Sequence, residues 1–341
     1  MSRKIRRILM ILAGFILIIL IAGAGIARYL MIAPYKGYRA PKIAITIPAG
    51  SSVNLIARML SKQGIIRHPL LLKSIFIFRK TEGQSKAGDY VYDRALSPLE
   101  VYDKLMKGEM YYNVITVPEG SNLFDISAIV EAKSVGSPGE FERSLKSKEV
   151  LSILHSIVPE VLSAEGFLFP ETYFLGKADG PQRLLLVMLG QFRKHYGGQE
   201  QERAKALGLT TVEVITLASL IEKETAQPSE RPLISGVFHN RLKRSMLLQC
   251  DPTVIYAMLL AGEFNGPILR QDLQRDSPYN TYLHSGLPPG PICNPGAASI
   301  QAALYPQDTD KLYFVSKNDG THYFAATLEE HNRAVQQYQR N

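Results

Sequence analysis

The chain has 341 residues, of which 46% are hydrophobic and 21% are charged, and its formal net charge is +8. This hydrophobic content excludes a disordered protein, and the length is sufficient for a membrane anchor and roughly two folded units. Only two cysteines, Cys250 and Cys293, are present, which excludes a disulfide framework and leaves open whether the two pair.

The chain begins with a basic tail followed by a long apolar run. Four of the first seven residues are Arg or Lys, whereas the twenty residues 8–27 carry no charge. Such a run is long enough to cross a bilayer once, and the positive flank places the N-terminal side in the cytoplasm. We therefore expect a cytoplasmic tail over residues 1–7, a transmembrane anchor over residues 8–28, and the remaining chain outside the cytoplasm.

A cleaved signal peptide is the alternative for this segment. Ala22, Ala24 and Ala27 offer small residues near its end, as a cleavage site requires. However, the apolar run is longer than the usual core of a signal peptide. A retained anchor is the favoured interpretation.

The charge and histidine patterns argue against several kinds of partner. The basic tail accounts for four of the eight net positive charges, and the rest are spread along the chain. This weak balance fits an acidic extracellular polymer, and because no nucleic-acid module is recognisable, we expect no nucleic-acid partner. No HxxxH, HExxH, GxxxxGK or GxSxG spacing occurs, so neither a metal, a cofactor nor a serine nucleophile is expected.

An internal repeat follows a short predicted linker over residues 29–41. Ile45–Ser51, which reads ITIPAGS, is echoed seventy residues later by Ile115–Ser121, which reads ITVPEGS. Each copy is a β-rich run followed by a Pro and Gly turn and then by an apolar-periodic helix, over Val53–Ser61 and Leu123–Glu131. The repeat predicts two related strand–turn–helix units, although this punctuation is also common in unrelated proteins.

The segment between the two copies completes a small module. We expect a helix over Pro69–Phe78, a strand over Ala87–Asp93 and a further helix over Pro98–Lys107. The β-α-α-β order indicates a LysM-like small α/β module over residues 41–110. As a carbohydrate-binding module it would need a shallow groove between helix and strand.

The segment AEGFLFPETY, residues 164–173, combines three aromatic side chains with two carboxylates. Aromatic faces stack on sugar rings and carboxylates bind hydroxyl groups, so this composition suits a sugar cleft. The alternative is a buried strand or turn with capping Glu residues. Glu165 is therefore a second candidate for a catalytic group.

A helix ending in two carboxylates is the strongest catalytic signal. Thr210 and Glu213 form a predicted capping box, and an apolar stripe follows at helical spacing. Because residue 227 precedes a proline, the helix should stop close to Glu224. A Glu at the end of a buried helix can have a raised pKa and donate a proton near neutrality, as a glycosidase acid does.

Helical geometry does not choose between the two carboxylates at this end. At about 100° per residue, Glu222 and Glu224 flank the apolar stripe on opposite sides. Both could also be solvated helix-end charges, which is the common fate of carboxylates.

Further helices, a loop and a hairpin are predicted after residue 228. Ser229 is expected to open a helix carrying FHNRL, and Asp251 reads as the N-cap of the next helix, with Pro252 at its first position. The Pro- and Gly-rich loop over residues 286–292 has a largely preset shape. A hairpin over residues 312–326 and a helix capped by Thr327 and Glu330 close the chain.

Five segments in this order resemble the endolytic murein transglycosylase (YceG-like) family. They are IEKETA, FHNRL, QCDPTVIYA, YNTY and GLPPGPICNPG. The resemblance extends over the anchor, the LysM-like region and the C-terminal half. It implies an α+β protein with a single N-terminal transmembrane helix, the small module and a mixed α+β catalytic domain over residues 111–341. Cys250 departs from the family pattern, which more often has Thr or Ser there.

The resemblance also implies a reaction and a site. The family's acid matches Glu224, which would cleave the β-1,4 bond between N-acetylmuramic acid and N-acetylglucosamine without water and leave a 1,6-anhydro end. Peptidoglycan strands are the implied substrate, and penicillin-binding proteins of wall elongation are implied partners at the bacterial inner (cell) membrane. Residues that either bind the sugar or hold the loops around it are then Tyr279, Asn280, Tyr282, Asn240, Gln249, Asp251 and Glu165.

Two other functions are compatible with the sequence. A hydrolase could use Glu224 and Glu165 as a carboxylate pair and would produce reducing ends. A non-enzymatic scaffold could bind the cell wall through the LysM-like region alone.

Overall fold

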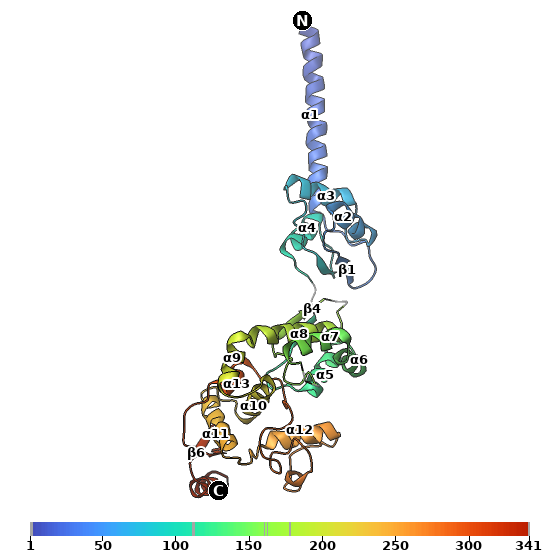
Figure 1. Cartoon of the computed structure of the whole chain (residues 1–341). Coiled ribbons are helices and arrows are strands. Elements are labelled where there is room, and N and C mark those ends of the chain that lie inside the picture. Colours follow the sequence, from blue (N-terminus) through green and yellow to red (C-terminus); the bar gives the residue numbers. More distant parts are fainter. Residues whose placement is uncertain (1–2, 111–112, 160, 162, 177–178, 340–341) are drawn as a thin grey trace. The chain divides into compact units, whose positions relative to one another are not determined.

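The computed structural model describes residues 3–110, 113–159, 161, 163–176 and 179–339. The chain forms two compact units, Met1–Tyr112 and Asn113–Asn341 (Figure 1). Each unit has its own hydrophobic core. The first two residues of the expected tail and the first two of the expected catalytic domain lie outside the described residues.

The N-terminal unit starts with a 30-residue helix, α1 (Arg3–Ile32). Its window Gly14–Ile32 has a mean hydropathy of 2.3, and none of that window is buried within the protein, as expected for a helix that could cross a membrane. The helix extends beyond the predicted end at residue 28. The expected linker over residues 29–41 is wrong, because residues 29–32 are helical and the Tyr35 backbone pairs with that of Leu96.

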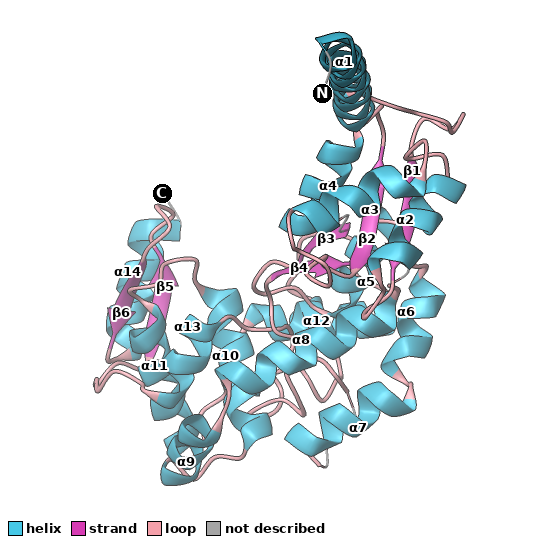
Figure 2. Cartoon of the chain, turned by 90° about the horizontal axis from the view of Figure 1, so that it is seen from above, coloured by secondary structure: helices cyan, strands magenta, loops and turns pink. Residues whose placement is uncertain are grey.

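The rest of this unit is a two-stranded antiparallel sheet with three helices. The strands pair from Ile43 opposite Tyr92 to Ile47 opposite Gly88, and Figure 2 shows them beside the helices. The β-α-α-β order is therefore confirmed. The elements are β1 (Ile43–Ile47), α2 (Val53–Lys62), α3 (Pro69–Phe78), β2 (Gly88–Tyr92) and α4 (Pro98–Lys107).

The C-terminal unit is mostly helical, with two further two-stranded antiparallel sheets, β3–β4 and β5–β6. Together with the N-terminal unit, this confirms a mixed α+β fold. The elements are β3 (Asn113–Thr116), α5 (Leu123–Ala132), α6 (Pro138–Leu145), α7 (Lys148–Ile157), β4 (Thr172–Leu175), α8 (Pro181–His195), α9 (Gly198–Ala206), α10 (Thr211–Glu224), α11 (Arg231–Lys243), α12 (Asp251–Ala261), η1 (Asp272–Gln274), α13 (Ala297–Leu304), β5 (Tyr313–Ser316), β6 (His322–Ala325) and α14 (Leu328–Gln339).

The two copies of the repeat have the same local structure. In each, a strand is followed by Pro-x-Gly, with φ of +76° at both Gly50 and Gly120, and by a helix. The side chains of Ser52 and Asn122 cap α2 and α5 by accepting a hydrogen bond from the third residue of the helix. A positive φ favours glycine, which explains why the turn keeps this residue in both copies.

Helix α10 forms the centre of the C-terminal unit. Thr210 and Glu213 make the predicted capping box, and residues 214–221 are all buried, so the helix is enclosed on every side along this stretch. Its neighbours are α9, α11, α12 and α13. The helix ends at Glu224, as predicted, and delivers this carboxyl group from the core to the edge of a cavity.

Two predicted helix starts are wrong by one or two residues. Helix α11 begins at Arg231 rather than Ser229, after a turn. Cys250, not Asp251, occupies the N-cap of α12, and it makes no side-chain cap. Asp251 is the first helical residue, so its carboxylate is available for another contact.

Candidate active site

A cavity of about 390 Å³ opens at the C-terminal end of α10. Its walls come from the 248–251 segment, from α11, from both strands of the C-terminal hairpin and from α14. The lining residues are Glu224, Arg241, Leu248, Gln249, Asp251, Tyr282, Phe314, Val315, Ser316, His322, His331, Val335 and Gln339.

Glu224 is half-buried, and part of the residue faces this cavity. Burial raises the pKa of its carboxyl group, and the nearby charge of Asp251 raises it further. Hydrogen bonding with Cys250 and the positive charges of His322 and Arg241 oppose the rise. The net effect is a raised pKa, so the carboxyl group stays protonated at a higher pH than an ordinary Glu. The same neighbours that oppose the rise can stabilise the ionised form.

Arg241 is a buried cation held in a fixed position. Its Nε donates to Leu312 O at 2.6 Å, and its Nη1 donates to the carbonyls of Leu248 at 2.8 Å and Leu247 at 3.3 Å. Its guanidinium also lies 5.3 Å from the ring centroid of Tyr313. Because backbone carbonyls carry no net charge, they orient the guanidinium without neutralising it.

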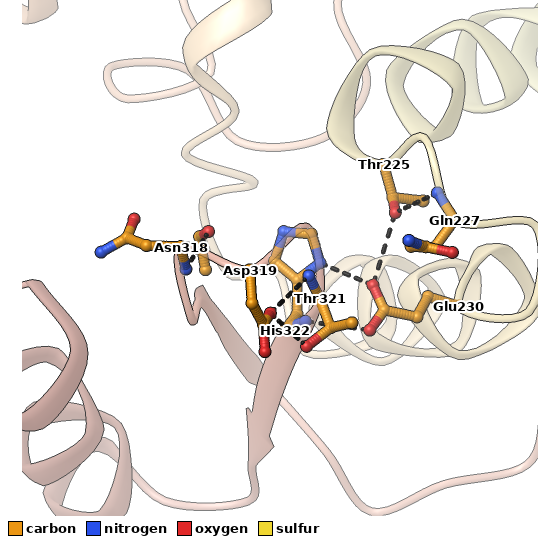
Figure 3. A network of polar contacts seen from close by, with 8 residues as sticks. Thr225, Gln227, Glu230, Asn318, Asp319, Thr321 and His322 are labelled. Carbon is orange, nitrogen blue, oxygen red and sulfur yellow. Dashed lines mark hydrogen bonds and ion pairs between the residues drawn. The ribbon is translucent and has the colours of Figure 1, made fainter.

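His322 is held against the opposite wall by Glu230. Its Nδ1 lies 2.6 Å from Glu230 Oε2, and its backbone N–H donates to Oε1 at 2.9 Å. The Thr225 hydroxyl donates to the same carboxylate at 3.4 Å, as the network in Figure 3 shows. These bonds connect the hairpin to the segment between α10 and α11, directly beyond Glu224.

Glu222, the other carboxylate of this helix end, is occupied by structural contacts. Its Oε1 lies 2.9 Å from Arg231 Nη2, and its Oε2 accepts from the Gly296 N–H at 2.9 Å. The side chains of Glu222 and Arg231 are only 5% and 9% exposed. Glu222 therefore fastens α10 to the start of α13, and only Glu224 of the two reaches the cavity.

Three of the predicted site residues meet Glu224 at the cavity. Gln249, Asp251 and Tyr282 all line it, and the Tyr282 hydroxyl donates to Asp251 Oδ1. Gln249 has a φ of +49°, an uncommon conformation for a residue with a side chain, and its N–H donates to Thr281 O at 3.1 Å. The 248–251 segment is thus held in a special conformation at the wall of the site.

Three other predicted site residues do not line the cavity. Asn280 is fully buried and donates to the carbonyls of Leu273 and Arg275. Asn240 donates to the carbonyls of Thr309 and Lys311. Tyr279 packs with its ring 5.1 Å from that of Tyr256. The two amides hold loops, and Tyr279 packs against the core, so none of the three residues lines the cavity.

Glu165 is also enclosed away from the cavity. It is 2% exposed, and it accepts hydrogen bonds from the Leu123 N–H, the Tyr256 hydroxyl and the Asn294 side chain, each at 3.0 Å. Burial raises the pKa of this carboxyl group to about 7, although the hydrogen bonds lower it. Its contacts tie together three distant parts of the chain and leave no carboxylate oxygen facing the cavity that Glu224 lines.

Both cysteines are buried free thiols. The Cys293 thiol lies 3.4 Å from Ser219 O inside the core. Cys250 lies beside Glu224, and its backbone N–H donates to the Thr281 hydroxyl at 3.0 Å. The residue that departs from the family pattern is therefore in direct contact with the candidate acid. Within the residues that the structure describes, there is no group of three or more His, Cys, Asp or Glu placed to hold a metal.

Sequence reasoning missed Arg241 and His322. A signal for Arg241 was present, since it lies three residues after buried Phe238 and thus on the buried face of α11. His322 had no local signal, because its partner Glu230 is 92 residues away in the chain.

Comparisons with known proteins agree on one relationship. The model of the YceG-like family matches residues 45–337. An endolytic murein transglycosylase of Bacillus subtilis is 34% identical, over 94% of this chain and 91% of the relative. One from Streptococcus pneumoniae is 32% identical over 87% of this chain, which spans 58% of that relative's length. The crystal structure of a YceG-like protein from Listeria monocytogenes matches with a TM-score of 0.59 and 31% identity, over 86% of this chain and 98% of that one.

Proposed function

Because the chain belongs to the YceG-like family, we propose that it acts as an endolytic murein transglycosylase, a lyase that cuts within peptidoglycan glycan strands. The observation that carries the proposal is the position of Glu224. It ends a buried helix, its pKa is raised by burial, and part of it faces a cavity. A protonated carboxyl group beside a polar cavity is what protonation of a glycosidic oxygen requires.

The reaction uses this one carboxyl group twice. Glu224 donates its proton to the oxygen that leaves the β-1,4 bond between N-acetylmuramic acid and N-acetylglucosamine. The carboxylate that remains is stabilised by the positive charge of Arg241, and by that of His322 when its ring is protonated. It then accepts the proton of the muramic C6 hydroxyl as the C6 oxygen bonds to the anomeric carbon, closing a 1,6-anhydro ring and restoring the acid.

An internal nucleophile removes the need for a second catalytic carboxylate. Glu165, the partner that a hydrolase was expected to use, is enclosed elsewhere in the core. Asp251 is the other carboxylate at the cavity, and its Oδ1 accepts from the Tyr282 hydroxyl. We assign Asp251, Tyr282 and Gln249 to sugar binding, and the charge of Asp251 also to keeping the pKa of Glu224 high.

The direct test is mass spectrometry of purified glycan strands after incubation with the wild type and with Glu224→Gln. We expect 1,6-anhydro ends from the wild type and none from the variant. Glu222→Gln, with its amide at the same helix end, is the matched control and should retain product formation. Reducing ends from the wild type would instead establish a hydrolase, and intact strands would favour a wall-binding scaffold.

We further propose that α1 anchors the protein in the cell membrane with its N-terminus in the cytoplasm. The support is the apolar window of the helix and the basic residues that precede it. In this position the enzyme meets strands near the membrane, where penicillin-binding proteins of wall elongation would be neighbours. Protease added outside intact cells should degrade the catalytic unit, and protection of that unit would contradict the orientation.

The small N-terminal module is proposed to bind glycan as a LysM-like domain. A groove of about 370 Å³ lies between the turn after β1 and the segment between α3 and β2, and it includes Ser52, Asn54, Lys73 and Glu82. In the Glu224→Gln background, Asn54→Arg should fill this groove and weaken sedimentation with insoluble peptidoglycan. Unchanged sedimentation would remove the glycan-binding role from this groove.

A further inference from the structure

A second, apolar cavity lies beside the C-terminal half of α1, within the N-terminal unit. Its volume is about 670 Å³, and α1 contributes residues at helical spacing, Ala24, Ala27, Arg28, Met31 and Ile32. The opposite wall comes from α3 with its C-cap Arg79, including Ile75 and Phe78, and from Leu99 of α4. Figure 1 shows α3 next to this end of α1.

The surface next to this cavity is unusually apolar for an exposed helix. On α3, Phe78 is 89% exposed, Leu70 is 62% exposed and Ile77 is 47% exposed. These residues share one face of the helix, whereas Leu72, Ile75 and Phe76 pack into the core of the module. Exposing three large apolar side chains on one face to water is unfavourable, so such a face indicates an apolar binding partner.

The position along α1 identifies that partner. The charge-free run ends at residue 27, and Arg28 is the first charged residue after it, so Arg28 marks the level at which acyl chains give way to headgroups. The cavity spans this level, with Ala24 and Ala27 on one side of it and Ile32 on the other. Its apolar walls therefore continue the surface that α1 presents to lipid.

Two guanidinium groups give the cavity a preference for negative charge. Arg28 and Arg79 both line it, together with Ser74. Arg79 also forms an ion pair with Asp103, with 3.3 Å between Nη1 and Oδ1. Both side chains are 45% exposed, so this surface ion pair is weak. Arginine and a hydroxyl beside an apolar groove match the phosphate and the acyl chain of a phospholipid.

We propose that this cavity binds an anionic phospholipid of the outer leaflet, and that the exposed face of α3 rests in the bilayer interface. The site would hold the small module flat against the membrane instead of leaving it suspended above. This inference rests on the proposed anchoring by α1, and it adds a contact that the anchor alone does not require.

The test uses the full chain in nanodiscs with an environment-sensitive dye on a single introduced cysteine. Phe78→Cys reports α3, Leu55→Cys is the matched exposed apolar control on α2, and Leu20→Cys reports α1. The native thiols are buried, and the unmodified chain measures any background labelling. Lipids brominated on their acyl chains should quench the dye at positions 20 and 78 and leave position 55 bright.

The outcomes separate the two proposals. A bright dye at position 20 would overturn the membrane anchor itself. Quenching at position 20 with a bright dye at position 78 would keep the anchor and overturn the docking of α3. Neither outcome depends on catalytic activity, so the transglycosylase assignment is judged separately.

Lipid retention tests the charged part of the site. The delipidated chain is incubated with an equimolar mixture of phosphatidylglycerol and phosphatidylcholine, and the bound lipids are measured by native mass spectrometry. We expect more bound phosphatidylglycerol, the anionic lipid, than phosphatidylcholine. Arg28→Gln with Arg79→Gln should reduce that preference by about fivefold or more, whereas Asp103→Asn, which releases Arg79, should increase it. An equal ratio of the two lipids in the wild type would overturn the anionic site.

Discussion

The buried acid at the end of α10 destabilises the fold when it is ionised. A folded-state pKa above the usual 4.5 of Glu means that the native state binds more protons than the unfolded chain. Stability should therefore fall as pH rises from 4.5 through the folded pKa. We expect Glu224→Gln, which cannot ionise, to be more stable than the wild type at neutral pH. Thermal unfolding across pH should show an advantage that shrinks as the pH falls towards 4.5; a variant less stable at neutral pH would contradict a raised pKa.

Cys250 should set the pH range over which that acid works. Its thiol lowers the pKa of Glu224 against the larger effect of burial. Ser donates a stronger hydrogen bond, and Ala donates none. Cleavage that needs the protonated acid should be lost at lower pH in Cys250→Ser and at higher pH in Cys250→Ala, with shifts of up to about one pH unit. The measurement is kcat/KM against pH, and identical alkaline limbs would exclude this contact.

At the same helix end, Glu222 should contribute to stability instead of chemistry. Glu222→Gln replaces a buried ion pair with Arg231 by a neutral contact, at a cost of about 2 kcal/mol. Denaturant unfolding should record this loss, and activity per folded molecule should be close to that of the wild type. Loss of activity with full stability would move the catalytic role to Glu222.

At the scale of elements, the C-terminal hairpin is attached to the site through Glu230. Burial raises the pKa of this carboxylate, but the hydrogen bonds and charge of His322 outweigh that effect, so the net pKa is lowered. A lowered folded pKa contributes stability above pH 4.5 that disappears as pH falls through the folded value. Glu230→Gln should therefore lose about 1 kcal/mol at neutral pH and little at acidic pH.

Activity distinguishes attachment from catalysis in this hairpin. If Glu230 positions His322, Glu230→Gln should lower kcat more than it raises KM, since the charge of His322 stabilises the carboxylate formed during the reaction. Asn318, whose side chain donates to Tyr338 O at the far end of the hairpin, provides the control, and Asn318→Ala should leave kcat unchanged.

The elements themselves were largely predictable from local chemistry. Capping residues, helix-initiating prolines and apolar spacing gave α3 and α4 their observed bounds. The site was less predictable, because its contacts join distant parts of the chain. The Tyr282 to Asp251 bond spans 31 residues, and the Asn240 to Thr309 bond spans 69. Sequence pattern places a polar residue in a loop, but it does not say whether the side chain faces the substrate or the loop.

The start of the N-terminal module shows the same limit. Residues 29–41 read as a linker, yet Tyr35 pairs with Leu96, and the Gly37 N–H donates to Gly64 O at 2.8 Å. These are backbone contacts, which side-chain patterns do not encode.

At the scale of the whole molecule, the two units have separate hydrophobic cores. The catalytic unit should therefore keep its chemistry without the anchor. A soluble form beginning at residue 33 retains the pairing of Tyr35, which a form beginning at residue 41 would lose. We expect residues 33–341 to release anhydro ends from purified strands at a rate within about threefold of the detergent-solubilised full chain, because binding and chemistry lie beyond α1. Failure to cleave would show that α1 has a part in the reaction.

The proposed anchoring of α1 changes what concentration means for this enzyme. A protein held by one helix diffuses in two dimensions. The rate at which it meets a strand then depends on the number of copies per area of membrane instead of per volume. Each growing strand would then be cut after a waiting time that shortens as more copies share the surface. Average strand length would become a ratio of two rates, that of polymerisation and that of lateral encounter, so the cell could adjust the mesh of its wall through copy number alone.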